Sequence, residues 1–220
     1  MCIRDRVTAL PFLKEIAELG LDVILSTGAS NLEEVATAVQ TLRDHGVGEL
    51  VLLHCVSSYP APAEALNLSA IGTMRSAFGV PVGYSDHTNG SEAAAQSILC
   101  GASVVEKHIT LDTRMEGPDH LASVTPDNFK SMVEAMQAAA LVRGDGIKQP
   151  ASCELPNLPL IRKSIVVRRS LPTGHVLKLE DLALKRPGSG IPPAELDKLP
   201  GHTLLRAYEI DEPLDWEGIE

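Results

Sequence analysis

The stretches GVPVGYSDHTNG (residues 79–90) and ASVVEKHITL (residues 102–111) decide how this chain folds. Each is an apolar run that leads to a histidine, His87 in the first and His108 in the second, and one helix-sized segment separates them. In a parallel α/β barrel, the carboxyl ends of neighbouring strands lie side by side on one face. Two histidines at such ends can share one divalent ion, so the pattern predicts a metal site.

The alternation of apolar runs and helical periods continues on both sides of these stretches. DVILST (22–27) and ELVLLHC (49–55) are two earlier strand-like runs, and Ser30 with Glu33 predicts a capping box for the helix between them. The periodicity predicts helices over residues 8–19, 30–44, a segment ending at 78, 91–100 and 125–142. The last helix opens with Thr125 as its cap and Pro126 in its first turn.

The apolar strands contain almost no alternation, which indicates an α/β fold with a parallel sheet covered by helices. We expect residues 7–143 to form this part of the fold. Four strand–helix units make half of an eight-stranded barrel, and the pattern starts on a helix. Either the sheet is open or an N-terminal half is missing, and periodicity does not decide between them. Residues 1–6 do not continue the pattern, so we expect them not to be native sequence.

Composition narrows the class of protein. The chain has 220 residues, of which 44% are hydrophobic, and a net charge of -10, which argues against a nucleic-acid partner. No apolar run reaches the roughly 18 to 20 residues that span a bilayer, and the N-terminus has no signal-peptide plan. We therefore expect a cytoplasmic protein that does not bind membranes. The spacing of the four cysteines (Cys2, Cys55, Cys100, Cys153) indicates reduced thiols.

The composition and the periodicity of the sequence change after the barrel-like region. Residues 144–160 are rich in prolines and other breakers without a period, which is typical of a linker. Residues 161–220 contain short β-rich runs separated by the turns LPTGH and RPGSG. They predict a separate, small, mostly β domain.

Several motifs together resemble one family. HCVSSYPAPAEALNL (54–68), GVPVGYSDHTNG, GASVVEKHITLD (101–112) and MEGPDHLASVTPDNFKSMV (115–133) are similar to the second half of the TIM-type (β/α)8 barrel of the sialic acid (N-acetylneuraminate) synthase family. KSIVVRRSLPTGHVLKLEDLALKRPGSGI (163–191) is similar to the family's antifreeze-protein-like (SAF) domain. The motifs occur in the family's order over nearly the whole chain.

The resemblance implies an activity and a cofactor. Enzymes of this family condense phosphoenolpyruvate with the open-chain aldehyde of an N-acetylated hexosamine, usually N-acetylmannosamine, and release phosphate. A divalent ion, Mn²⁺ or Mg²⁺, would be bound by His87 and His108, and would withdraw electron density from the aldehyde oxygen. Imidazole ligands also suit zinc, so the identity of the metal stays open. The family's architecture further implies a domain-swapped homodimer.

The resemblance also assigns substrate contacts. Phosphoenolpyruvate would be bound by strand-end groups at Ser26, Ser57 and Ser85, although many family members have asparagine at the position of Ser57. Tyr59 matches a substrate-contacting tyrosine, and Asp119 matches an acidic residue that binds sugar hydroxyls and would orient them as the new bond forms. Arg186 matches an arginine that holds the N-acetyl group from the partner subunit.

Each of these side chains also has an ordinary structural interpretation. The histidines could be hydrogen-bonded rim residues, Ser26 and Ser85 could satisfy local backbone groups, and Tyr59 could pack under its loop. Asp119 could be a turn residue, and Arg186 a solvated surface cation. Among strand-end groups, we expect His54 to be structural and Cys55 to be a buried thiol.

Two other functions stay open from the sequence. A different metal-dependent barrel aldolase or isomerase would explain the histidines, and a non-catalytic sugar-binding module would explain the C-terminal domain. The family places further phosphate-binding residues and an acidic residue in the first half of its barrel. We therefore expect this chain to be a fragment that is inactive unless another segment or self-association closes the sheet. Which hexosamine is accepted, in the neuraminate, legionaminate or pseudaminate series, is not determined by these motifs.

Overall fold

The computed structural model describes residues 6–220, which divide into two compact units with the boundary between Gly146 and Ile147. The expectation about residues 1–6 falls outside the described range except for Arg6. Each unit has a hydrophobic core of its own.

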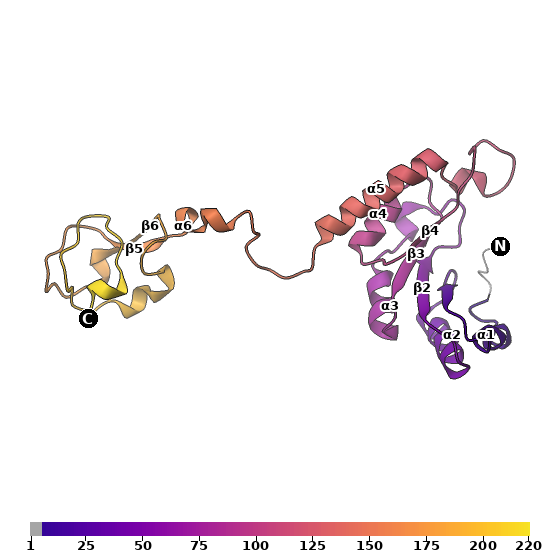
Figure 1. Cartoon of the computed structure of the whole chain (residues 1–220), viewed down its shortest axis with the longest axis horizontal. Helices are drawn as coiled ribbons and strands as arrows, with labels where there is room; N and C mark the ends of the chain where they lie inside the picture. Colours follow the sequence, from indigo (N-terminus) through magenta and orange to yellow (C-terminus); the bar gives the residue numbers. More distant parts are fainter. Residues whose placement is uncertain (1–5) are drawn as a thin grey trace. The chain divides into compact units, whose positions relative to one another are not determined.

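The first unit is built on one parallel sheet (Figure 1). The strands are β1 (Val23–Ser26), β2 (Leu50–Cys55), β3 (Val82–Asp86) and β4 (Val105–Lys107), and they lie in the order β1-β2-β3-β4. Every neighbouring pair is parallel, with register partners such as Leu53 and Gly83. The prediction of a parallel α/β half-barrel is confirmed.

Helices connect the strands and cover the sheet. They are α1 (Leu10–Ala17), α2 (Leu32–Asp44), α3 (Ala70–Phe78), α4 (Glu92–Leu99) and α5 (Pro126–Arg143), with 3₁₀ turns at Ala63–Ala65 and His120–Ala122. Figure 1 shows α3 and α4 on the same side of the strands. Side chains of alternate strand positions, including Leu52, Val82 and Tyr84, pack beneath these helices and are fully buried. On the opposite face, Ile24 of β1 is 60% exposed.

The N-terminal caps of α2 and α5 were both predicted from the sequence. The capping box of α2 was predicted at Ser30 and Glu33, and this is wrong by one residue. Asn31 has the extended backbone of a cap, and its Oδ1 accepts hydrogen bonds from the backbone N–H groups of Glu33 (3.0 Å) and Glu34 (2.9 Å). The Glu34 carboxylate accepts the Asn31 N–H in return. The predicted Thr125 cap of α5 is confirmed, because its hydroxyl accepts from Asn128 N–H.

The second unit is small and mostly extended. An antiparallel pair, β5 (Ser164–Val167) and β6 (Leu182–Lys185), is preceded by α6 (Leu158–Ile161). Further 3₁₀ turns lie at Leu155–Asn157, Leu179–Asp181, Pro193–Lys198 and Trp216–Gly218, and isolated antiparallel bridges join the loops. Its core is formed by buried side chains such as Ile165, Leu177, Leu204 and Leu214. The predicted small β-rich domain is confirmed. In neither unit is any described helix long and apolar enough to cross a membrane.

A buried carboxylate organises the loops of the second unit. Asp181 is 1% exposed, accepts from His175 Nε2 (2.8 Å) and Arg169 (2.8 Å), and also accepts the backbone N–H of Lys178 (3.0 Å). Burial acts to raise the pKa of this carboxyl. The hydrogen bonds from His175, Arg169 and the Lys178 backbone outweigh burial and lower the pKa to about 2.

We expect the second unit to lose stability in acid through Asp181. The folded pKa lies below the ordinary value, so the carboxylate stabilises the fold above about pH 4, and this contribution is lost as the pH falls toward 2. A shift of this size is worth roughly 2 kcal/mol. Urea unfolding followed by the fluorescence of Trp216, the only tryptophan, measures it at pH 6 and pH 3. Asp181→Asn should reduce the difference between the two pH values; an unchanged pH dependence would contradict the assignment.

Candidate functional site

The two strand-end histidines lie next to each other. His87 follows β3 and His108 follows β4, and their ring centroids are 5.6 Å apart with the planes at 80°. The parallel register of the two strands brings both residues to the same level of the sheet, because Asp86 and Lys107, which precede them, are register partners. The sequence prediction that these histidines converge is therefore met by the geometry.

The hydrogen bonds of His87 define its tautomer. Its Nδ1 lies 2.7 Å from the backbone carbonyl of Val56, which is only an acceptor, so Nδ1 carries the proton and donates. In the neutral ring, Nε2 then has the lone pair, and the Tyr59 hydroxyl, 2.7 Å away, donates to it. An imidazole whose Nδ1–H is held by a backbone carbonyl is the usual arrangement of a metal-binding histidine.

Tyr59 completes a cluster of three rings. Its ring centroid lies 4.2 Å from that of His87 and 5.6 Å from that of His108. Tyr59 lies in the loop after β2, so the ends of β2, β3 and β4 all contribute to the cluster. The structure thus places Tyr59 against both histidines, beyond the substrate-contact role that its motif implied.

Asp119 approaches the cluster from the long loop after β4. Its Oδ2 lies 4.0 Å from His108 Nδ1, and its side chain is half exposed. The loop is held in place because Val124 N–H donates to the carbonyl of His108 and the Ser123 hydroxyl donates to that of Asp119. A carboxylate at the solvent-facing side of two imidazoles can accept hydrogen bonds from hydroxyl groups of a ligand.

Ser85 faces the site beneath His87. Its hydroxyl donates to Glu106 Oε1 (2.7 Å), and its oxygen lies 3.3 Å from His87 Nε2. A serine has one hydroxyl proton, so Ser85 must turn away from Glu106 before it can donate to an anionic ligand. Glu106 was not singled out from the sequence, and its place on β4, two residues before His108, was the available signal.

Ser26 and Ser57 belong to the β1 and β2 ends of the same face. Ser26 closes β1 beside Leu53, its register partner, and is partly buried. Ser57 is exposed and touches the β1 loop at Gly28, where a Cβ would collide with Ser57 Oγ and would lie 2.6 Å from Cys55 Sγ. The close approach of these two loops therefore requires glycine at position 28.

We expect Gly28→Ala to destabilise the first unit by about 1–3 kcal/mol, because the added methyl group overpacks against the buried Cys55. Thermal unfolding followed by far-UV circular dichroism measures the change. Gly72→Ala in α3 is the matched control: no atom lies within 4 Å of its added Cβ, and alanine favours a helix. Equal stability of the two variants would show that the loops adjust freely.

Arg186 belongs to the second unit. It is exposed, and its Nε donates to the backbone carbonyl of Ile161 (3.0 Å). Its guanidinium therefore keeps further N–H donors. The predicted contact of Arg186 with substrate stays a prediction.

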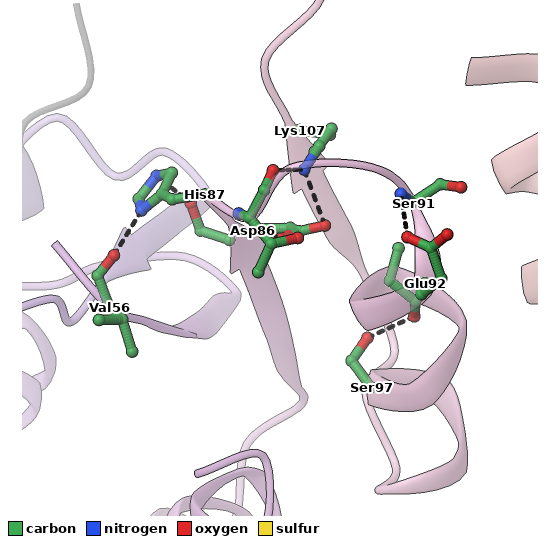
Figure 2. Close-up of polar contacts among 10 residues, drawn as sticks. Val56, Asp86, His87, Ser91, Glu92, Ser97 and Lys107 are labelled. Atoms are coloured by element: carbon green, nitrogen blue, oxygen red, sulfur yellow. Dashed lines mark hydrogen bonds and ion pairs between the residues drawn. The ribbon is translucent and has the colours of Figure 1, made fainter. Parts of the chain in front are cut away.

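An ion pair that was not predicted from the sequence lies directly behind the histidines. Lys107 Nζ lies 3.0 Å from Asp86 Oδ2, and both side chains are fully buried. Figure 2 shows His87 directed to Val56 and Asp86 directed the other way, to Lys107. The signal in the sequence was an acidic and a basic residue at the ends of two apolar strands, each directly before a histidine.

The donor set fits a divalent ion bound with few protein ligands. The rings of His87 and His108 lie with their centroids 5.6 Å apart, and Asp119 Oδ2 lies 4.0 Å from His108 Nδ1. Within residues 6–220, no three His, Cys, Asp or Glu side chains gather closely enough to bind a metal by themselves. A site with two imidazoles leaves positions for water and substrate, as a Lewis acid requires.

The remaining strand-end candidates are structural. His54 Nε2 bonds the carbonyl of Leu66 (2.8 Å), and Cys55 is buried. Cys100 and Cys153 are free thiols as well, and Cys2 lies outside the described residues.

The first unit is thus a parallel half-barrel with paired strand-end imidazoles, and the second is a small β-rich domain. A profile of the NeuB family matches residues 5–148, and a SAF domain profile matches residues 162–220. The chain belongs to the NeuB family, with a SAF domain at its C-terminal side.

Individual relatives agree with the family assignment. The chain is 42% identical over 218 residues to the N,N'-diacetyllegionaminic acid synthase of Legionella pneumophila, covering 97% of this chain and 61% of the relative. It is 34% identical over 229 residues to the N-acetylneuraminate-9-phosphate synthase of Drosophila melanogaster, covering 93% and 62%. The chain thus spans about three fifths of the length of these relatives.

A solved structure matches both units. The spore coat polysaccharide biosynthesis protein E of Chromobacterium violaceum aligns with a TM-score of 0.80 at 27% identity, over 98% of this chain and 65% of that one. The half-barrel and the antifreeze-like domain therefore occur together in this fold.

Proposed function

We propose that this chain forms the metal-binding and sugar-binding part of a nonulosonate synthase, which condenses phosphoenolpyruvate with an N-acetylated hexosamine and releases phosphate. The observation that carries the proposal is the pair His87 and His108, with ring centroids 5.6 Å apart and with His87 Nδ1 donating to the Val56 carbonyl. N-acetylmannosamine and its diacetylated relatives are the acceptors we favour, given the named activities of the relatives.

The proposed cofactor is Mn²⁺ or Mg²⁺, bound by His87 Nε2 and His108. When bound, it would polarise the aldehyde of the open-chain sugar and make its carbon more electrophilic. Tyr59 donates to His87 Nε2 in the structure, and an ion bound at that nitrogen would free the Tyr59 hydroxyl to donate to the substrate.

The other side chains hold the two substrates. Ser57 and Ser85 donate hydroxyl hydrogen bonds to the phosphoenolpyruvate anion, and Ser26 contributes from the end of β1. Asp119 accepts from sugar hydroxyls beside His108, which orients the aldehyde. Arg186 donates to the carbonyl oxygen of the N-acetyl group, reaching the site from the SAF domain of a second subunit in a domain-swapped homodimer.

Four strands are half of an eight-stranded barrel, so we propose that the full reaction needs the complementary half. The test combines this chain with the part of the Legionella relative that the match leaves uncovered. Phosphate release from phosphoenolpyruvate is then measured with Mn²⁺ and a series of N-acetylated hexosamines.

The proposal expects phosphate release that depends on both the amino sugar and the metal, and none from either part alone. Turnover of sugar phosphates without phosphoenolpyruvate would favour a different barrel aldolase or isomerase. Sugar binding that is indifferent to metal and to both histidines would favour a non-catalytic binding module. A mass of one subunit by light scattering for the combined protein would contradict the homodimer.

A further inference from the structure

The buried pair of Asp86 and Lys107 lies in an unusual place. Asp86 ends β3 and Lys107 ends β4, and the two are register partners. Each directly precedes one of the histidines. Because successive side chains of a strand alternate between faces, the ion pair lies on the helix-covered face, opposite to His87 and His108. Figure 2 shows this divergence at residues 86 and 87.

The pair is tied to the backbone on both sides of His87. Lys107 Nζ donates to the carbonyl of Thr88 (2.6 Å) while it contacts Asp86 Oδ2 (3.0 Å). Asp86 Oδ1 accepts from the backbone N–H (2.9 Å) and the hydroxyl (2.8 Å) of Thr88. His87 therefore lies between two residues that are fixed to each other and to Lys107, the neighbour of His108.

Neither charge has access to water. Both side chains are 0% exposed, in a position where apolar residues would cover the sheet at a lower desolvation cost. A buried ion pair often adds little to the net stability of a fold. Its best-attested role is to favour one structural arrangement over alternatives. At this point the pair fixes the relative position and the orientation of the ends of β3 and β4.

We propose that Asp86 and Lys107 are positioning residues that set the separation and orientation of the His87 and His108 rings for ion binding. The proposal rests on the proposed metal function of these histidines and deepens it. The pair acts through the backbone, because neither side chain lies on the face where the rings meet.

The test replaces the pair by apolar side chains of similar shape, Asp86→Leu with Lys107→Met, in the full 220-residue chain. Such replacements usually leave a fold intact. Mn²⁺ affinity is measured by titration calorimetry. The His87 Nδ1–H, which donates to Val56, is followed by its proton resonance and exchange rate. Asp86→Asn is the second variant: its Oδ1 can still accept from Thr88, while the counter-charge of Lys107 is removed.

We expect the dissociation constant of Mn²⁺ to rise roughly ten- to hundredfold in the double variant, with a smaller rise in Asp86→Asn. The Nδ1–H resonance should exchange faster in both. Asp181→Asn, which removes the buried carboxylate of the second unit, is the matched control and should leave both readouts unchanged.

A folded double variant with wild-type Mn²⁺ affinity and a slowly exchanging Nδ1–H would overturn the proposal. If Asp86→Leu with Lys107→Met does not fold, Asp86→Asn decides by the same two readouts. If the wild-type chain itself binds no Mn²⁺, the proposed metal function fails, and the Nδ1–H exchange alone decides whether the pair positions His87.

Discussion

His87→Ala is expected to weaken Mn²⁺ binding by more than about a hundredfold and, in the completed barrel, to reduce condensation by roughly a thousandfold or more. The ring supplies one of two imidazoles, and alanine leaves neither a ligand nor an acceptor for the Tyr59 hydroxyl. Titration calorimetry with the 220-residue chain measures the affinity. Phosphate release from phosphoenolpyruvate measures the reaction.

His54→Ala is the matched control for this prediction. His54 also lies near the end of a parallel strand, but its register partner is Tyr84, which places it on the helix-covered face, and it bonds the carbonyl of Leu66. Its removal should leave Mn²⁺ affinity unchanged as long as the chain stays folded. Equal losses in the two variants would mean that binding reports general folding and not a site at His87.

Much of this site could be predicted from the sequence because short apolar runs identify the strands, and parallel pairing then fixes where their ends lie. Apolar runs such as residues 49–55 form buried parallel strands, and the parallel register aligns their carboxyl ends. A histidine directly after each of two neighbouring strands must then meet the other at one face. The convergence of His87 and His108 follows from these two steps.

The contacts that complete the site depend on tertiary placement. Nothing local indicates that the Val56 carbonyl accepts from His87, 31 positions further along the chain, or that Glu106 accepts from Ser85. The helix cap shows the same limit on a smaller scale. Asn31 and Ser30 are both suitable caps, and the extended backbone at Asn31 decides between them.

The Asp86 and Lys107 pair is buried, although charged residues at strand ends are ordinarily expected to be exposed to solvent. Charged residues at strand ends are usually solvated, and composition gives no reason to pair these two. The register of β3 and β4 places them opposite each other, and α4 after β3 closes over this face. Pairing then offsets part of the desolvation cost of the two charged groups at this depth.

Lys107→Met alone is expected to destabilise the first unit by about 3–5 kcal/mol. The substitution leaves the Asp86 carboxylate buried without its counter-ion, and an uncompensated buried charge is costly. Urea unfolding followed by far-UV circular dichroism measures the loss, since most of the helical residues belong to this unit.

The comparison with the double variant separates the effect of the Asp86 and Lys107 pair on stability from its effect on Mn²⁺ affinity. Asp86→Leu with Lys107→Met removes both charges but also the partners of the Thr88 N–H, hydroxyl and carbonyl, so its stability should lie above that of Lys107→Met and below that of the wild type. If the pair chiefly positions the histidines, stability recovers in the double variant while Mn²⁺ affinity does not. Recovery of both would mean that apolar packing is sufficient to align the strand ends. A single variant as stable as the wild type would show that water reaches Asp86 and that the charge is not buried in solution.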